Sequence, residues 1–322
     1  MVAASGLALG YLEHRLRHEQ AEVQAVRWLD YKSNAAVTIS CEEVQPRGPS
    51  WLHDICPSHY DSLLWGLRAY GISESAIVDS DLVAFANSTS LSSLDLSDSA
   101  VTDTGIEALQ EPNRLTYVAL NATKITDRGV SALSAYPNLA RLELGYTGVT
   151  DASCATLART TQLLSLILNG TAVTDSGLAH LSTMRTLESL ELGDTAVTDQ
   201  GLEYCKPLVA LESLDLSNTR ISDSGLVRLV PLRQLRDVDL SETEITDEGL
   251  RTLMGFESLE WVDLCKTKVT ASGIRGLNRF GCTTPSQPDS ASVVEKSDGE
   301  FTLTANSALK RPAVTILTDL SD

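Results

Sequence analysis

The sequence has few aromatic residues and little positive charge, and each shortage excludes a class of protein. Only 5% of its 322 residues are aromatic, so a core must be built mainly from Leu, Val, Ile and Ala. Lys and Arg number 25 against 43 Asp and Glu, which gives a net charge of −18. A surface of this sign repels phosphate backbones and anionic lipid. We therefore expect no nucleic-acid partner.

Long apolar runs are also missing, since no stretch reaches the roughly 18 residues that a membrane-spanning helix needs. The apolar start MVAASGLALGYL lacks a basic segment before it and is followed by EHRLRHEQ, which makes a poor signal peptide. It is either the beginning of a soluble helix or the end of an anchor helix that is truncated in this chain. The corresponding predictions are a cytoplasmic protein and, as the alternative, a membrane-tethered one.

Motifs that carry chemistry are absent. The six cysteines form no C-x-x-C pair, which argues against a zinc site or a redox dithiol but leaves one or two disulfides open. The sequence contains no G-x-S-x-G, P-loop, H-E-x-x-H or G-x-G-x-x-G motif. We therefore predict no enzyme, no catalytic residue, no cofactor and no metal site.

A 24-residue repeat dominates the remaining sequence. Each repeat reads L-x-x-L-x-L-x-x-T-x-[VI]-T-D-x-G-L-x-x-L, and eight repeats fill residues 91–282 without an insertion. A degenerate ninth copy starts at Leu67. Positions within a repeat are counted from its first leucine, which is Leu91, Leu115, Leu139, Leu163, Leu187, Leu211, Leu235 or Leu259.

This pattern resembles the leucine-rich repeat family, and more narrowly the T-D-x-G-L variety that is found in bacterial proteins and is related to F-box-associated repeats. The resemblance covers well over half of the chain. It implies an α/β leucine-rich-repeat solenoid, with a curved parallel sheet on the concave face and short helices on the convex face.

The physics of one repeat agrees with this resemblance. The alternation in L-x-x-L-x-L predicts a short strand, in which Leu190 and Leu192 point inward and Glu191 points outward. The threonine at position 9 is expected to bond the backbone of the neighbouring turn. Thr198 and Asp199 are typical of a helix N-cap, so we interpret the aspartates at position 13 as caps rather than calcium ligands. Cys154 and Cys205 occupy core positions and should be small buried hydrophobic residues.

The repeats divide the chain into three predicted regions. Residues 1–66 form an N-terminal helix and capping region, with an F-box-like partner-binding module as the sharper alternative. Residues 67–282 form the repeat array. Residues 283–322 are a flexible tail or a hairpin that covers the last strand, because an open sheet edge invites aggregation.

The concave face is the candidate site, because repeat arrays present it as an extended binding surface. Acidic residues outnumber basic ones there. Asp215, Asp239 and Asp263 fall on consecutive strands, where each adjacent pair repels by about 0.8 kcal/mol even in water. The predicted contact residues are Tyr117, Arg141, Glu143, Tyr146, Ile167, Glu191, Asp215, Asp237, Asp239, Trp261 and Asp263.

These observations predict a non-enzymatic interaction module that binds a protein or peptide, of basic character, on its acidic concave face. The repeat array itself should bind neither nucleic acid nor membrane. Two alternatives remain open: the substrate-recognition subunit of a ubiquitin-ligase-type adaptor, and the ectodomain-like part of a membrane-tethered receptor.

Overall fold

The structure is a computed structural model of the chain, and it describes residues 77–83, 86, 93–109, 115–160, 162–274, 292–295, 300–304 and 314–317. The predictions made for residues 1–66 lie outside these ranges, as does most of the region 283–322. The chain forms two compact units, Met1–Glu143 and Leu144–Asp322, which we name the N-terminal unit and the C-terminal unit.

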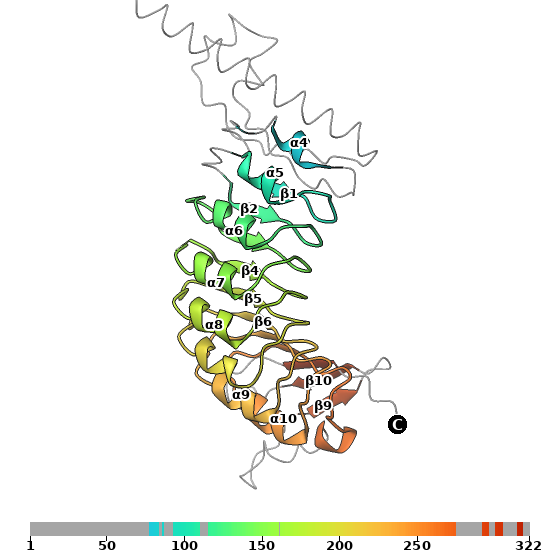
Figure 1. The fold of residues 1–322 in the computed structure, drawn as a ribbon. Helices are drawn as coiled ribbons and strands as arrows, with labels where there is room; N and C mark the ends of the chain where they lie inside the picture. The colour runs from blue at the N-terminus through green and yellow to red at the C-terminus, as the bar shows by residue number, and fades with distance from the viewer. Residues whose placement is uncertain are drawn as a thin grey trace, which may run out of the picture. The chain divides into compact units, whose positions relative to one another are not determined.

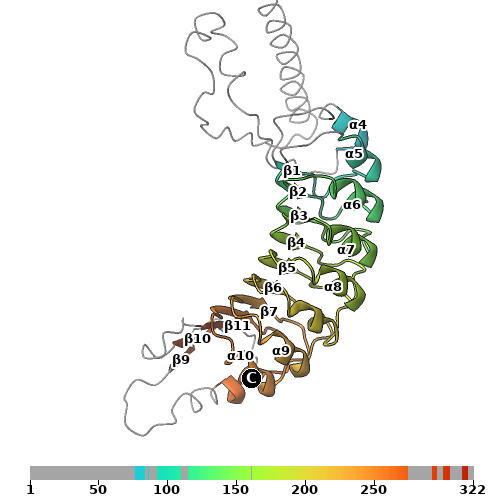
Figure 2. The same cartoon turned by 90° about the vertical axis from the view of Figure 1, so that its left-hand side faces the viewer.

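The N-terminal unit alternates short helices with three-residue strands (Figures 1 and 2). Its strands pair in parallel and in register, so that Leu94 lies beside Val118 and Val118 beside Leu142. The helices lie on the opposite side of the repeats from the strands (Figure 2). The described elements are α4 (Asp79–Leu82), β1 (Ser93–Asp95), α5 (Asp103–Glu107), β2 (Tyr117–Ala119), α6 (Asp127–Leu133) and β3 (Arg141–Glu143).

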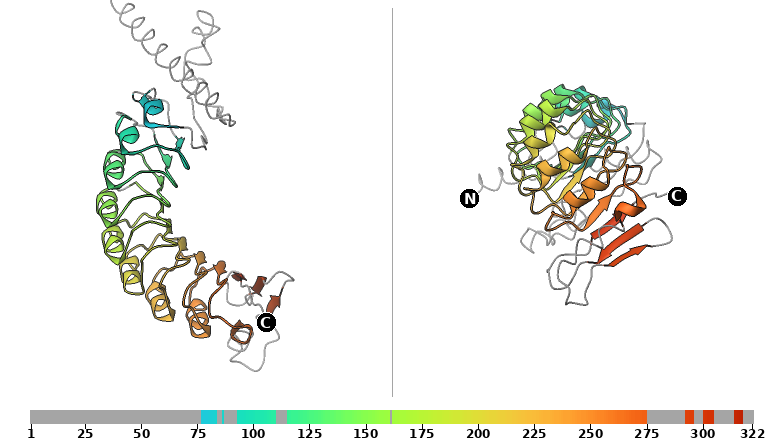
Figure 3. Two further views of the ribbon diagram at one scale, coloured as in Figure 1. Left: turned by 45° about the vertical axis from the view of Figure 1, so that its right-hand side comes forward. Right: turned by 90° about the horizontal axis from the view of Figure 1, so that it is seen from below.

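The C-terminal unit continues the same alternation, and its strands β4 to β8 pair in parallel in chain order. Within this unit the strands line the inner side of a curve and the helices line the outer side (Figure 3). The repeating elements are α7 (Asp151–Leu157), β4 (Ser165–Ile167), α8 (Asp175–Leu181), β5 (Ser189–Glu191), the 3₁₀ helix η2 (Gly201–Cys205), β6 (Ser213–Asp215), α9 (Asp223–Leu229), β7 (Asp237–Asp239), α10 (Asp247–Leu253) and β8 (Trp261–Asp263).

Three further strands extend the sheet of the C-terminal unit: β9 (Ser292–Glu295), β10 (Glu300–Thr304) and β11 (Val314–Leu317). Strand β11 pairs in parallel with β8, and β10 pairs antiparallel with both β11 and β9. The last repeat strand, β8, therefore has hydrogen-bonding neighbours on both sides.

The boundaries of the three predicted regions, 1–66, 67–282 and 283–322, stay a prediction.

Leucine and β-branched residues form the core of each repeat. In the repeat that starts at Leu187, the side chains of Leu187, Leu190, Leu192 and Val197 are fully buried. Burying one such side chain contributes about 1.5–3 kcal/mol. Because a single repeat cannot bury this stripe alone, stacking is required. The predicted α/β leucine-rich-repeat solenoid is thus confirmed in each unit.

The two cysteines at core positions behave as predicted. Cys154 and Cys205 are fully buried and carry no disulfide. Burial raises the pKa of the Cys205 thiol to about 12, so the reactive thiolate form is strongly disfavoured.

The threonine at position 9 bonds within its own repeat, which differs from the expected bond to a neighbouring turn. The Thr195 hydroxyl donates to the carbonyl oxygen of Leu192 at 2.6 Å, and Thr171 does the same to Leu168 at 2.6 Å. The residue just before, at position 8, adopts a left-handed backbone in every described repeat. The hydroxyl therefore satisfies a buried carbonyl at the point where the strand turns sharply.

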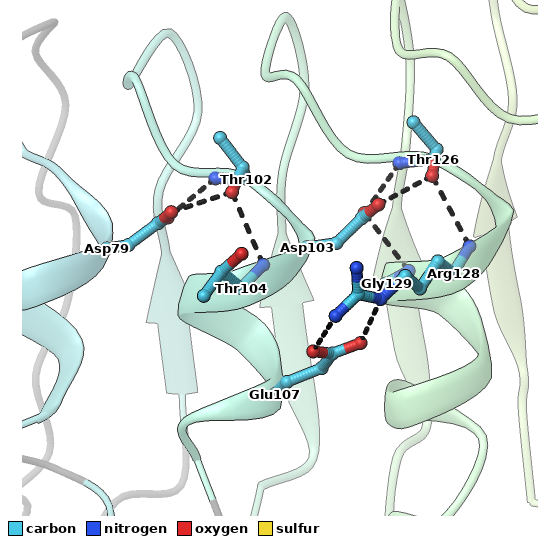
Figure 4. A network of polar contacts seen from close by, with 8 residues as sticks. All are labelled: Asp79, Thr102, Asp103, Thr104, Glu107, Thr126, Arg128 and Gly129. Carbon is cyan, nitrogen blue, oxygen red and sulfur yellow. Dashed lines mark hydrogen bonds and ion pairs between the residues drawn. The ribbon is translucent and has the colours of Figure 1, made fainter.

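The aspartate at position 13 links neighbouring repeats, and its interpretation as a cap of its own helix was wrong. The cap is the preceding residue: Thr102 accepts the N–H of Thr104 at 3.3 Å. The Asp103 carboxylate instead receives the Thr126 N–H at 2.8 Å and the Thr126 hydroxyl at 2.6 Å, from the next repeat (Figure 4). It also receives the Gly129 N–H at 3.0 Å.

We name this arrangement the aspartate clamp. In the C-terminal unit its aspartates are Asp151, Asp175, Asp199, Asp223 and Asp247. The clamp also explains the glycine at position 15, because a Cβ on Gly225 would lie 2.3 Å from Oδ1 of Asp199. The T-D-x-G motif therefore joins one repeat to the next.

Among the residues described, no helix is long and apolar enough to cross a bilayer.

Candidate interaction surface

The outward side chains of the C-terminal unit form straight rows across its strands. Strand pairing places Ile167, Glu191, Asp215, Asp239 and Asp263 side by side, one from each strand. All five are partly exposed, whereas the leucines and valines between them point into the core. We name Asp215, Asp239 and Asp263 the aspartate row.

Each member of the aspartate row is held by the turn that follows its strand. Oδ1 of Asp215 accepts the N–H of Ser217 at 2.8 Å, and Oδ1 of Asp239 accepts the N–H of Ser241 at 2.8 Å. The Cys265 N–H donates to Asp263 at 2.8 Å in the same way. This local bond is an Asx turn, which fixes the orientation of the carboxylate with one of its two oxygens.

The carboxylates of the row are close enough to affect one another. The pKa of Asp239 is raised, chiefly because the side chain is half-buried, and the charges of Asp215 and Asp263 raise it further. The two hydrogen bonds from Ser241 act in the opposite direction. No ion pair of the described residues involves a member of the row. The ionised row therefore brings like charges together, and Asp239 stands between two of them.

The basic residues next to the row are paired with acids of neighbouring repeats. Arg236 lies between Glu212 and Glu260, at N–O distances of 3.8 and 3.1 Å. Lys266 pairs with Glu242 at 2.6 Å, and Lys268 pairs with Glu244. These pairs are exposed and each contributes about 0–1 kcal/mol. None of these three basic residues pairs with a member of the aspartate row.

Asp237 and Trp261 form a second row beside the first, because the pairing of β7 with β8 places them side by side. Burial raises the pKa of Asp237, and the neighbouring charge of Glu260 raises it further while Arg236 lowers it. Trp261 is partly exposed. A partly exposed indole beside charge is typical of interface anchors.

Asn169 belongs to this surface, although it is not among the predicted contact residues. Its side-chain amide donates to Oε2 of Glu191 at 2.9 Å and to Oδ2 of Asp215 at 3.1 Å. Its carbonyl oxygen accepts the Gly193 N–H at 2.8 Å. Asn169 thus joins three consecutive repeats. Its place at position 7 of the repeat, two residues after the end of β4, is a sequence signal that could have identified it.

The remaining predicted contact residue of this unit, Tyr146, lies in the turn at 145–147. The residue is 61% exposed, and its hydroxyl donates to Oδ2 of Asp194 at 2.9 Å. Tyr146 is therefore a fixed, exposed aromatic group at the border of the acidic strand face.

In the N-terminal unit the predicted residues Tyr117, Arg141 and Glu143 come together. Pairing of β2 with β3 places Tyr117 beside Arg141. The Tyr117 hydroxyl donates to Oε1 of Glu143 at 3.0 Å, and the Asn121 amide donates to Oε2 at 2.7 Å. Burial, together with the charge of Glu143, raises the pKa of Tyr117. Both oxygens of Glu143 thus have donors from within the protein.

Metal chemistry has no visible basis in the part of the chain that the structure describes. None of its groups of His, Cys, Asp or Glu side chains is arranged to hold a metal ion. The repeated acids bond to hydroxyl, amide and backbone donors instead.

Comparison with known proteins agrees with the repeat geometry. A family model described as "Leucine Rich repeat" matches residues 87–109, 183–204, 211–230 and 233–254. No curated protein matches the chain in sequence.

Similar solved structures include two internalins of Listeria monocytogenes. Internalin inlF is 23% identical, with 61% of this chain and 66% of that chain covered and a TM-score of 0.45. Internalin inlC2 is 24% identical, with 63% and 81% covered and a TM-score of 0.44. A TDR receptor is 17% identical, with 61% and 34% covered and a TM-score of 0.42. The family match and the strand and helix geometry together identify the four matched segments as leucine-rich repeats.

Proposed function

We propose that the strand face of the C-terminal unit binds a protein or peptide segment of basic character, and that the protein acts through this binding rather than through catalysis. The aspartate row is the observation that carries the proposal. Three carboxylates stand in register on adjacent strands, and each is oriented by its own turn.

Electrostatics favours a cationic partner at this row. Burial and like charge both disfavour the ionised form of Asp239, and a cation placed nearby would oppose both effects by stabilising the carboxylate. Three nearby basic side chains, Arg236, Lys266 and Lys268, pair with glutamates rather than with the row. A partner's lysine or arginine would therefore add charge pairing that the free protein lacks.

Strand geometry favours an extended partner. Parallel strands are about 4.8 Å apart, so the row presents carboxylates at regular short intervals. Trp261 adds an apolar group next to Asp237 at one end. A segment in which basic side chains alternate with small or apolar ones would match this surface.

The test is a titration of the full chain with a fluorescent peptide of four Gly-Ser-Arg repeats, followed by fluorescence anisotropy. Replacing Asp215, Asp239 and Asp263 with Asn keeps the turn-capping oxygen and removes three charges. We expect the affinity to fall by about tenfold or more, and the wild-type affinity to fall as salt is raised.

The matched control removes three carboxylates away from the strand face, by Glu203→Gln, Glu248→Gln and Glu257→Gln. These acids pair with exposed basic residues beside the helices. The control should bind the peptide nearly as the wild type does. Equal losses in both triple variants would show only a response to net charge and would overturn the proposal.

A further inference from the structure

Tyr146 presents an aromatic ring that the backbone holds in an unusual position. Its φ angle is 55°, in the left-handed region that bulky residues rarely occupy. Its N–H donates to the carbonyl oxygen of Asn169 at 2.6 Å. The turn thus fixes where the side chain leaves the backbone, and 61% of the residue is still exposed.

Gly170 of the next repeat makes room for this ring. A Cβ added to Gly170 would lie 2.3 Å from Cδ1 and 2.4 Å from Cε1 of Tyr146. The ring therefore rests directly on the glycine backbone. Gly170 also has a φ of 65°, which glycine adopts without strain. Both the space and the backbone angle make glycine the suitable residue here.

The far end of the ring is tied to the repeat beyond. The Tyr146 hydroxyl donates to Oδ2 of Asp194 at 2.9 Å, and the side-chain amide of Asn218 donates to Oδ1 of Asp194. The hydrogen bond to Asp194 is the main cause of a raised pKa of Tyr146, and the charge of Asp215 adds to it. The phenol therefore stays protonated and bound, with negative charge close to the ring.

We propose that Tyr146 is the specificity-determining residue of an arginine subsite, in which the guanidinium of a basic partner stacks on the exposed side of the ring. This inference rests on the proposed function and narrows the partner to one with an arginine at this position. Guanidinium groups are planar and weakly hydrated, so they stack on aromatic faces better than an ammonium does.

Two features of the site favour such stacking. The ring is fixed at Cα, at one side and at the hydroxyl, so little conformational freedom is lost when a partner binds. The charges of Asp194 and Asp215 lie close enough to affect the phenol, and they attract a cation over the ring.

The test compares peptides of four Gly-Ser-Arg repeats and four Gly-Ser-Lys repeats on the full chain. Tyr146→Leu keeps apolar bulk and removes the π face. We expect it to weaken the arginine peptide by about fivefold and the lysine peptide by less than about twofold. Tyr146→Phe, which loses only the tie to Asp194, should give a smaller loss. Tyr204→Leu, at the 42% exposed tyrosine of η2, is the matched control and should change neither affinity.

The outcomes separate this inference from the proposal on which it rests. If the triple Asn variant weakens both peptides but Tyr146→Leu weakens them equally or not at all, the arginine subsite is wrong and the acidic surface stands. If the triple Asn variant changes neither affinity, or the wild type binds neither peptide, both are wrong. A circular-dichroism melt within about 2 °C of wild type confirms that Tyr146→Leu is folded.

Discussion

On the helix side of the C-terminal unit, Asp199 faces the amide and hydroxyl of Ser222 and the hydroxyl of Ser224, all within 2.8 Å. On the strand side, Asp239 has Asp215 and Asp263 as its partners in the adjacent repeats. Both aspartates recur with the 24-residue period and both are partly exposed. What differs is the set of groups that the next repeat places against them.

This comparison teaches that the period alone does not say what a repeated acid does. An acid stabilises the stack when the neighbouring repeat offers donors, because hydrogen bonds to a charged group contribute about 1.5–3 kcal/mol. The same acid opposes the stack when the neighbouring repeat offers another acid. The strand face thus keeps a feature that costs stability, as expected of a binding surface.

The largest effect should come from breaking one clamp. Asp199→Ala removes the acceptor for three donors and leaves the N–H of Ser222 without this partner. We expect the free energy of unfolding, measured with urea, to fall by about 2–3 kcal/mol. Asp215→Asn, measured in parallel, should change it by less than about 1 kcal/mol. A small loss in the Asp199 variant would remove the distinction between the aspartate clamp and the aspartate row.

A second, smaller effect tests the fit between the clamp and its glycine. Gly225→Ala places a Cβ 2.3 Å from Oδ1 of Asp199 and 3.1 Å from Cδ1 of Leu202. We expect a loss of about 1–2 kcal/mol, even though alanine is the better helix former. In an Asp199→Ala background the same substitution should cost much less, because the clash is gone. A double-mutant cycle measures this coupling, and strictly additive losses would contradict it.

The smallest expected effect is a gain in stability on the strand face. The folded-state pKa of Asp239 is raised, so its protonated form contributes stability that is present below the unfolded pKa of about 3.9 and lost as pH rises through the folded value. Asp239→Asn should therefore be more stable than wild type at pH 7, by less than about 1 kcal/mol. Urea unfolding at pH 7 and pH 3 should show the gain only at pH 7, and a loss at pH 7 would contradict the electrostatic account.

Much of the fold followed from the sequence because the repeat fixes its own geometry. The strand at L-x-x-L-x-L, the inward face of Leu190 and Leu192, and the burial of Cys205 depend on local alternation and on stacking at a constant step. Such features need no knowledge of which atoms meet.

The contacts between repeats could not be predicted in the same way. The bond from Asp199 to Ser222, the left-handed turn at Tyr146 and the bridging by Asn169 all depend on where a side chain of the next repeat comes to lie. The membership of the acidic surface could be proposed from position within the repeat. Its hydrogen bonds and ion pairs, which determine which charges are offset, depend on how the side chains of neighbouring repeats lie in three dimensions.

The most direct test of the account measures stability and binding on the same two variants, Asp199→Asn and Asp239→Asn. The first removes one charge from the aspartate clamp, and the second removes one charge from the aspartate row. We expect Asp199→Asn to lose about 1–2 kcal/mol of unfolding free energy and to keep wild-type affinity for the Gly-Ser-Arg peptide at a temperature where it is folded. Asp239→Asn should keep or gain stability and lose about threefold in affinity. If both variants changed the same property in the same direction, the division between a structural aspartate clamp and a binding aspartate row would be contradicted.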